Sequence, residues 1–391
     1  MIRRIGAAAL ATATTLVLAA CGTNTTNSHD DVVIGASMML SGQVALTTIQ
    51  DGYQWAVDTA NAAGGIDVGG TKRKVSLKIL DNRGDTGTMV QQVRTLALQD
   101  KAAGLLGSCC QQNMEMQAQA DALQIPLVMG ALPVELLPKG KGYGWNSFQS
   151  LSDGAEGFFD VAATAGTNKT ILLITNNDAA GAGTAQQWGD LARAAGFTVA
   201  VETAAPAGTT DYADTIARAK AAGAQVLIAA MTPPDCFAMW KQMKALAYTP
   251  KLAIGLQCAQ TPGWTSLGAL GAGTLLQMNW TRTSGLPQAD AIVAKFGTKY
   301  PNDNELASVA IGYHEATILL AAITKAGTTD RAKVNAALAS TDLTSTLGPV
   351  KFTDNKHTTP SFIGQWNADG TITQVWPAHG ASALKPLSGL A

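Results

Sequence analysis

The chain has 391 residues, of which 47% are hydrophobic and 14% charged, with a formal net charge of −1 at pH 7. A nearly neutral chain without a basic patch does not fit a protein that binds nucleic acid through its phosphates. The chain is too long for one typical hydrophobic core, so we expect two lobes.

The N-terminus shows an export signal. Arg3-Arg4 precedes an apolar, threonine-containing run that is too short for a comfortable membrane span of about 20 residues. The run ends in Leu18-Ala19-Ala20-Cys21, where small residues suit a signal peptidase and the cysteine thiol can accept a diacylglycerol. We predict a signal peptide over residues 1–20 and a lipidated tether over 21–30 that anchors the protein to the outer face of a membrane. The alternative is an ordinary signal peptide followed by an unrelated cysteine.

Strands and helices alternate from residue 32 onward. The first set comprises strands at 32–36, 74–80, 104–107 and 126–129 with helices at 50–63, 86–99 and 113–123. A second set begins after residue 150, with strands at 171–174, 197–201, 225–230 and 251–254 and helices at 184–195, 211–222 and 235–247. Apolar strands that alternate with helices predict parallel sheets covered on both faces, here one sheet in each lobe.

The third part of the chain has a different order. We predict a strand at 274–280, then three helices at 289–300, 304–326 and 330–339, and then three strands at 350–352, 361–366 and 371–376. The sequence Asn-Ala-Asp-Gly at 367–370 predicts a turn between the last two strands.

Four cysteines remain once Cys21 is lipidated, and an exported protein can form disulfides. Cys236 and Cys258 follow consecutive predicted strands, so we predict a disulfide between them at the rim of the second lobe. Cys109 and Cys110 are adjacent and are expected to remain thiols. The alternative is that all four are small buried residues that do not pair. Without a Cys-x-x-Cys pair or a histidine cluster, we expect no metal and no cofactor.

This succession resembles the Leu/Ile/Val-binding family of type I periplasmic binding proteins, the substrate-binding components of ABC transporters. Four segments carry the resemblance: Leu40-Ser41-Gly42, residues 61–66 (Asn-Ala-Ala-Gly-Gly-Ile), residues 107–110 (Gly-Ser-Cys-Cys) and residues 348–354 (Gly-Pro-Val-Lys-Phe-Thr-Asp). It covers nearly the whole chain after the tether.

The resemblance implies two doubly wound parallel-sheet lobes joined by a hinge of three crossings, near residues 148–152, 278–281 and 350–355. Lobe one would hold residues 31–149 plus 280–350, and lobe two would hold 150–279 plus 351–391. Ligand would bind between the lobes, at the carboxyl ends of the strands. Hinge closure around the ligand would then form the surface that a permease recognises.

The loop Ser108–Asn113 is polar and leads into a helix, so it suits a carboxylate, although Ser108 or Gln111 could simply cap that helix. In the family this loop holds an amino-acid carboxylate, while an acid and aromatic residues of lobe two hold the remainder. Here those positions carry no such residues, and Asp235 fits better in the first turn of its helix. An amino-acid ligand is therefore in doubt. The predicted ligand-binding residues are Ser41, Thr47, Ser108, Cys110, Gln111, Gln112, Ala131, Leu132, Ala180, Gly181, Thr232 and Gln257.

We therefore predict a monomeric, lipid-anchored solute-binding protein without catalytic activity. It would capture an amino-acid-like compound, an amide or an aromatic or organic acid, and deliver it to an ABC permease. A ligand-sensing receptor of the same fold, coupled to a membrane kinase or chemoreceptor, is the alternative. A secreted enzyme fits less well, because no nucleophile–base arrangement is evident.

Overall fold

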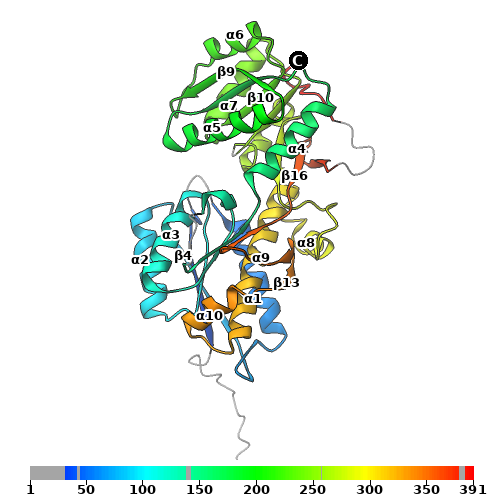
Figure 1. The fold of residues 1–391 in the computed structure, drawn as a ribbon. Coiled ribbons are helices and arrows are strands. Elements are labelled where there is room, and N and C mark those ends of the chain that lie inside the picture. Colours follow the sequence, from blue (N-terminus) through cyan, green and yellow to red (C-terminus); the bar gives the residue numbers. More distant parts are fainter. Residues whose placement is uncertain (1–30, 42–44, 138–141, 257, 378–383) are drawn as a thin grey trace, which may run out of the picture.

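The computed structural model describes residues 31–41, 45–137, 142–256, 258–377 and 384–391. The predicted signal peptide, Cys21 and the tether lie outside these residues. Figure 1 shows two lobes, one above the other, each built around a twisted sheet with helices on its faces. The predicted fold class is confirmed: two α/β lobes with parallel-sheet cores.

The sheet of the first lobe has six parallel strands in the order β15-β7-β6-β5-β1-β4. Side chains alternate between its faces: Leu106 packs toward α1 and α9, whereas Leu105 packs toward α2 and α3. Both faces are apolar and buried, as a parallel sheet requires. The strands are β1 (Val32–Met38), β4 (Val75–Asp81), β5 (Leu105–Leu106), β6 (Leu127–Met129), β7 (Gly144–Phe148) and β15 (Lys356–Thr358). The helices are α1 (Thr47–Ala62), α2 (Thr86–Arg94), the π-helical turn Thr95–Gln99, α3 (Cys110–Leu123), α9 (Asp303–Ala326) and α10 (Arg331–Leu338).

The sheet of the second lobe has seven strands in the order β17-β16-β12-β11-β10-β8-β9. Strands β8 to β12 are parallel, and β16 and β17 extend the sheet in antiparallel fashion. The strands are β8 (Thr170–Asn176), β9 (Thr198–Ala205), β10 (Val226–Ala230), β11 (Leu252–Gly255), β12 (Leu275–Met278), β16 (Phe362–Trp366) and β17 (Ile372–Trp376). The helices are α4 (Leu151–Thr164), α5 (Ala179–Ala194), α6 (Ala213–Ala221) and α7 (Pro233–Ala245).

Smaller elements complete the two lobes. The sequence patterns either did not predict these elements or predicted them with other bounds; they are two hairpins, a short helix and two 3-10 segments. They are β2 (Ile66–Val68) with β3 (Thr71–Arg73), β13 (Leu343–Ser345) with β14 (Gly348–Val350), α8 (Ala289–Phe296), and the 3-10 segments Val134–Leu136 and Pro262–Leu270.

The chain passes between the sheets three times. It leaves the first sheet after β7 and enters α4, leaves the second sheet after β12 and enters α8, and passes from β15 to β16. The third crossing lies further along the chain than the predicted residues 350–355. Lys356 pairs with Asn146 and Thr358 with Phe148, so residues 356–358 extend the first sheet and the crossing lies beyond them. A strand of Lys-His-Thr has no apolar alternation that would reveal it.

Helix α9 is the central helix of the first lobe. Its length and hydropathy would suffice to span a membrane, but 83% of its most apolar window is buried inside the protein, as in a core helix. It packs very closely on α1, because a Cβ at Gly52 would lie 2.2 Å from the carbonyl oxygen of Val309 and one at Gly312 would lie 2.2 Å from that of Ile49. Glycine at both positions therefore allows the two backbones to touch.

Candidate ligand-binding site

The carboxyl ends of both sheets face the opposite lobe. Strand β7 ends at Phe148, and the chain enters the second lobe only a few residues later. Strand β12 ends at Met278 and leads back into the first lobe. Because the other strands around them run parallel, the loops that follow β1, β4, β5 and β6 lie on the same side as the end of β7, and those after β8, β10 and β11 lie beside the end of β12.

In the first lobe, a buried polar network joins the loops after β4 and β5. The Asn82 amide nitrogen donates to Gln112 Oε1 at 3.2 Å and to Ser37 Oγ at 3.1 Å. The Ser108 hydroxyl donates to the same Gln112 oxygen at 3.0 Å. All of these side chains are almost completely buried. Ser108 and Gln112 are thus fixed in place by neighbours, as buried polar groups require.

Asn113 ties the loop after β5 to the loop after β6. Its Oδ1 accepts a hydrogen bond from the Ser108 backbone amide at 2.7 Å, and its Nδ2 donates to the Gly130 carbonyl at 2.6 Å. The side chain is fully buried. It sets the distance between the two backbone segments that carry Ser108 and Ala131.

Helix α3 begins at Cys110 without a side-chain cap, because its N-cap residue, Cys109, makes no cap hydrogen bond. The Ser108 hydroxyl, just before this start, donates to Gln112. The first-turn amides, at the positive end of a helix dipole, suit an anionic oxygen. Gln111 lies exposed in that first turn.

The loop after β1 is fastened to β4 by Asp81. Its carboxylate accepts hydrogen bonds from the Ser41 hydroxyl at 2.6 Å and from the backbone amides of Leu40 at 3.0 Å and Arg83 at 2.9 Å. These hydrogen bonds, led by that of Ser41, lower the pKa of Asp81 to about 2. The carboxylate is thus ionised at neutral pH, and the Ser41 hydroxyl hydrogen is donated to it in a hydrogen bond.

A buried pair lies behind the loops of the first lobe. The Tyr53 hydroxyl, on α1, is 2.5 Å from Oε2 of Glu315 on α9 and 3.0 Å from the carbonyl oxygen of Gly107. Both side chains are fully buried. Burial raises the pKa of the Glu315 carboxyl to about 8, against the lowering effect of the Tyr53 hydrogen bond.

In the second lobe, Asp235 forms hydrogen bonds to three loops. Its carboxylate accepts from Asn176 Nδ2 at 2.9 Å after β8, from the Gly208 amide at 2.8 Å after β9, and from the Thr232 hydroxyl at 2.7 Å after β10. Asp235 is only 1% exposed. All three hydrogen bonds come from the protein itself, so this acid organises the loops and is not presented to a ligand. The prediction that it sits in the first turn of its helix, α7, is confirmed.

The loop after β8 passes very close to α5. A Cβ at Gly181 would lie 1.8 Å from the carbonyl oxygen of Asn176, so only glycine fits there. The Gly181 amide donates to Asp178, which caps α5. The charge of Asp178 is thereby placed at the positive end of a helix dipole.

Cys236 and Cys258 are joined by a disulfide in the structure, with their Cα atoms 6.2 Å apart. Strands β10 and β11, which precede them, are parallel neighbours. The predicted position at the rim was wrong, because both cysteines are fully buried and belong to the core formed around Trp240 and Trp264. Cys109 is buried as well.

The predicted ligand-binding residues thus differ in their surroundings. Ser108, Gln112, Leu132 and Gly181 are buried, Ala131 is half-buried, and Ser41, Thr47, Gln111 and Thr232 are exposed. The Thr232 hydroxyl is used by Asp235, and the Ser41 hydroxyl by Asp81. The side chains of Cys110 and Ala180, and Gln257 entirely, lie outside the described part of the structure.

Sequence reasoning missed several residues that shape the site: Asp81, Asn82, Tyr53 and Glu315. Asp81 ends a strand that the sequence predicts, and Asn82 follows it, so their position at a carboxyl end was available as a signal. Tyr53 and Glu315 lie inside helices, and no local pattern marks them.

The sequence profile of the periplasmic binding protein family matches residues 31–371. The chain belongs to this family. Its members bind solutes outside the cytoplasm and are not enzymes, which confirms the predicted solute-binding role and the absence of catalysis.

Relatives of this periplasmic binding protein include Leu/Ile/Val-binding protein homolog 8 of Brucella abortus, 25% identical over 383 residues that cover 90% of this chain and 92% of the relative. Among solved structures, LivJ of Streptococcus pneumoniae in complex with isoleucine has a TM-score of 0.75 at 19% identity and covers 88% of this chain and 99% of its own. A solute-binding protein of R. palustris in complex with benzoate has a TM-score of 0.72 at 17% identity, covering 88% and 95%. These structures share the fold.

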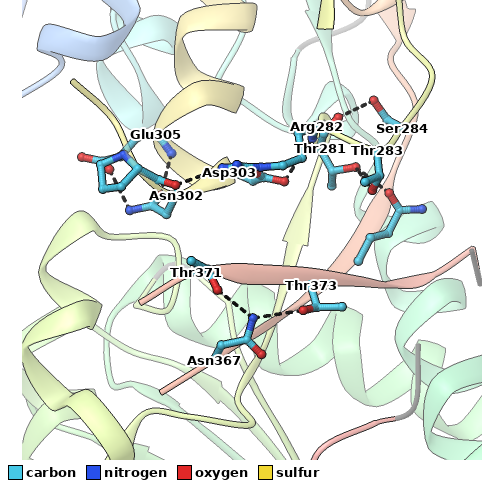
Figure 2. Close-up of polar contacts among 12 residues, drawn as sticks. Thr281, Arg282, Thr283, Ser284, Asn302, Asp303, Glu305, Asn367, Thr371 and Thr373 are labelled. Atoms are coloured by element: carbon cyan, nitrogen blue, oxygen red, sulfur yellow. Dashed lines mark hydrogen bonds and ion pairs between the residues drawn. The ribbon is translucent and has the colours of Figure 1, made fainter. Parts of the chain in front are cut away.

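The three crossings of the binding protein are tied together by buried polar contacts. Gln277 donates through Nε2 to the Ser150 carbonyl at 2.9 Å and to the Ser361 hydroxyl at 3.0 Å, so the side chain at the second crossing contacts the first and the third. Figure 2 shows the next residues along the second crossing, where Arg282 pairs with Asp303 at the start of α9, with 2.5 Å between Nε and Oδ1. Asp303 is 3% exposed. The hinge is therefore anchored in both lobes.

Proposed function

We propose that this binding protein is a lipoprotein that captures a small organic ligand with a carboxylate or amide group and no α-ammonium, and delivers it to an ABC importer. The observation that carries the proposal is the start of α3, where a buried polar loop leads into a helix N-terminus without a side-chain cap. Such a terminus favours a carboxylate or an amide oxygen, because its amide hydrogens point outward and its dipole is positive.

The second lobe supports the absence of an α-ammonium. A buried ammonium group needs a carboxylate partner. In the described loops of this lobe, the buried carboxylate is that of Asp235, and three hydrogen bonds from the protein enclose it. It is therefore not left for a ligand ammonium. Asp178 and Asp211 are exposed and accept the backbone amides of Gly181 and Ala213. The benzoate complex of the R. palustris protein is a precedent for an aromatic carboxylate on this fold.

Calorimetry with benzoate, benzamide and leucine tests the proposal. We expect benzoate or benzamide to bind at least tenfold more tightly than leucine. Gln111→Ala, in the first turn of α3, should weaken that binding, whereas Gln119→Ala, in the middle of the same helix, should not. Tight binding of leucine or valine would refute the ligand class.

Lipidation is a separate part of the proposal. Cys21→Ala removes the thiol that would accept the lipid, so the variant should be released from membranes or remain unprocessed. Labelling with a palmitate analogue and fractionation of membranes check this result. A Cys21→Ala protein that is still labelled and still fractionates as a mature lipoprotein would contradict the assignment. Delivery would be checked by uptake of the identified ligand in cells that carry or lack the protein.

A further inference from the structure

Tyr53 of α1 and Glu315 of α9 form a buried polar pair between these two helices. The polar atoms of the pair lie against the backbone of the candidate site. Tyr53 reaches the Gly107 carbonyl, one residue before Ser108. Glu315 reaches Gly130, one residue before Ala131, since a Cβ at Gly130 would lie 2.5 Å from Glu315 Oε1.

The arrangement of donors and acceptors fixes where the protons lie. Tyr53 has one hydroxyl hydrogen but two oxygen neighbours, the Glu315 carboxyl at 2.5 Å and the Gly107 carbonyl at 3.0 Å. If Glu315 is neutral, its carboxyl donates to the Tyr53 oxygen and Tyr53 donates to Gly107, so each hydrogen has an acceptor. If Glu315 is ionised, the Tyr53 hydrogen turns to the carboxylate and the Gly107 carbonyl loses this partner.

We infer that Glu315 is a positioning residue for ligand binding: its neutral carboxyl, acting through Tyr53, holds the Gly107 carbonyl and with it the loop that leads into α3. This inference rests on the carboxylate or amide site proposed above. It adds that ligand binding is linked to a proton on a side chain that does not contact the ligand. Ionisation of Glu315 frees the loop and also places a buried negative charge behind a site that favours an anion.

The surroundings of the pair support a neutral carboxyl. Burial raises the pKa of Glu315 and outweighs the hydrogen bonds from Tyr53 and from the backbone of Gly130 and Gly107, which lower it. Burial together with the neighbouring Glu315 raises the pKa of Tyr53 well above its usual value. Cys109 is the titratable group of the β5–α3 loop that acts on Tyr53. Strands β5 and β6, which also pack on α9, contain no titratable residue.

The remaining charged and titratable groups on elements around α9 are bound elsewhere or lie at the surface. On α9 itself, His314 is hydrogen-bonded to Ser147 of β7 at 2.6 Å and lies near His357, and burial lowers its pKa to about 3, so it is neutral. The others on α9 are Asp303 with Arg282, Glu305 with Asn302, Tyr313 against the Trp55 ring, and Lys325 with the Ser340 carbonyl. Those on neighbouring elements are Asp51 with Lys299 and Tyr300, Asp58 with Gln54, Asp67 with the Gly70 amide, Arg331 with the carbonyls of Ala97 and Ala102, and the exposed Asp290, Lys295 and Lys333. No cation among these pairs stabilises an ionised Glu315.

The first experiment uses no ligand. Hydrogen exchange of the backbone amides in residues 105–112 is measured at one pH, near 7, in the full chain and in two variants. Tyr53→Phe removes the link to Gly107 and should speed exchange of this segment about tenfold or more, while Glu315→Gln keeps a donor toward Tyr53 and should leave it unchanged. Equal exchange in Tyr53→Phe and the unaltered protein would overturn the inference.

The second experiment measures the affinity for benzoate against pH, because the charge of benzoate is constant from pH 6 to pH 9. If only the protein with neutral Glu315 binds, Kd should rise about tenfold between pH 7 and pH 9. Glu315→Gln should keep the affinity seen at pH 7 and lose the pH dependence, and the control Glu305→Gln, on the same helix, should keep the dependence. The inference fails if Glu315→Gln retains the rise or if the unaltered protein shows none. If benzoate does not bind even at pH 7, the proposed ligand class is at fault and the exchange experiment decides the role of Glu315.

Discussion

Removal of the disulfide in the second lobe should cost a well-defined amount of stability. Cys236 and Cys258 are separated by 22 residues, and closing a loop of that length stabilises a protein by about 3 kcal/mol in the chain-entropy model. The double variant Cys236→Ala/Cys258→Ala should therefore unfold at lower urea, with a free energy of unfolding reduced by about 3 kcal/mol or slightly more, since two buried sulfurs are also lost. In a lobe of ordinary domain size this corresponds to a fall in Tm of roughly 6–12 °C.

Tryptophan fluorescence is a suitable probe, because Trp240 and Trp264 lie in the same core as the disulfide. The unaltered protein unfolded in the presence of a reductant should approach the curve of the double variant. Cys109→Ala, a buried cysteine of the first lobe, serves as control and should leave the effect of reductant unchanged. A double variant within about 0.5 kcal/mol of the unaltered protein, or a curve insensitive to reductant, would refute the reasoning.

Two further predictions concern buried carboxyl groups. Asp235→Ala should lower the free energy of unfolding by roughly 2–4 kcal/mol, because Asn176 and the Gly208 amide lose their acceptor; a loss under about 1 kcal/mol in urea unfolding would show that water replaces the carboxylate. For Glu315, whose pKa is raised from 4.5 to about 8, the folded protein holds a proton that the unfolded chain releases, so this contribution to stability is full below pH 4.5 and is lost as the pH rises to about 8. Relative to Glu315→Gln, the unaltered protein should lose roughly 2–3 kcal/mol between pH 5 and pH 7, and parallel stability curves for the two proteins would contradict this.

The regular part of the fold could be predicted because it follows from apolar periodicity. Short apolar segments bounded by glycines and polar residues predicted the strands of both parallel sheets. The order of these segments along the chain predicted the two lobes. Helix α4 was not predicted, although Ser150 and Asp153 form a capping pattern at its start. Gly154 and Gly157 lower helix propensity, and the reason for Gly157 is tertiary: a Cβ there would lie 2.6 Å from the Trp376 ring.

The candidate site could be predicted only to the level of loops. The carboxyl ends of predicted strands identify which segments meet, because parallel strands end on the same side. They do not identify which side chains remain available. The hydroxyl groups of Ser41 and Thr232 are taken by Asp81 and Asp235, and the first of these contacts joins residues 40 positions apart. The link from Glu315 to Tyr53 spans 262 positions and depends on how closely α1 approaches α9, which no local pattern records.

The most direct test of the central claim is mass spectrometry of the compound that co-purifies with the protein. The binding protein is isolated under native conditions, unfolded in organic solvent, and the released small molecules are quantified against the protein. We predict a near-stoichiometric organic acid or amide without an α-amino group, and a thermal shift when that compound is returned to the ligand-free protein. Stoichiometric leucine, isoleucine or valine would contradict the account.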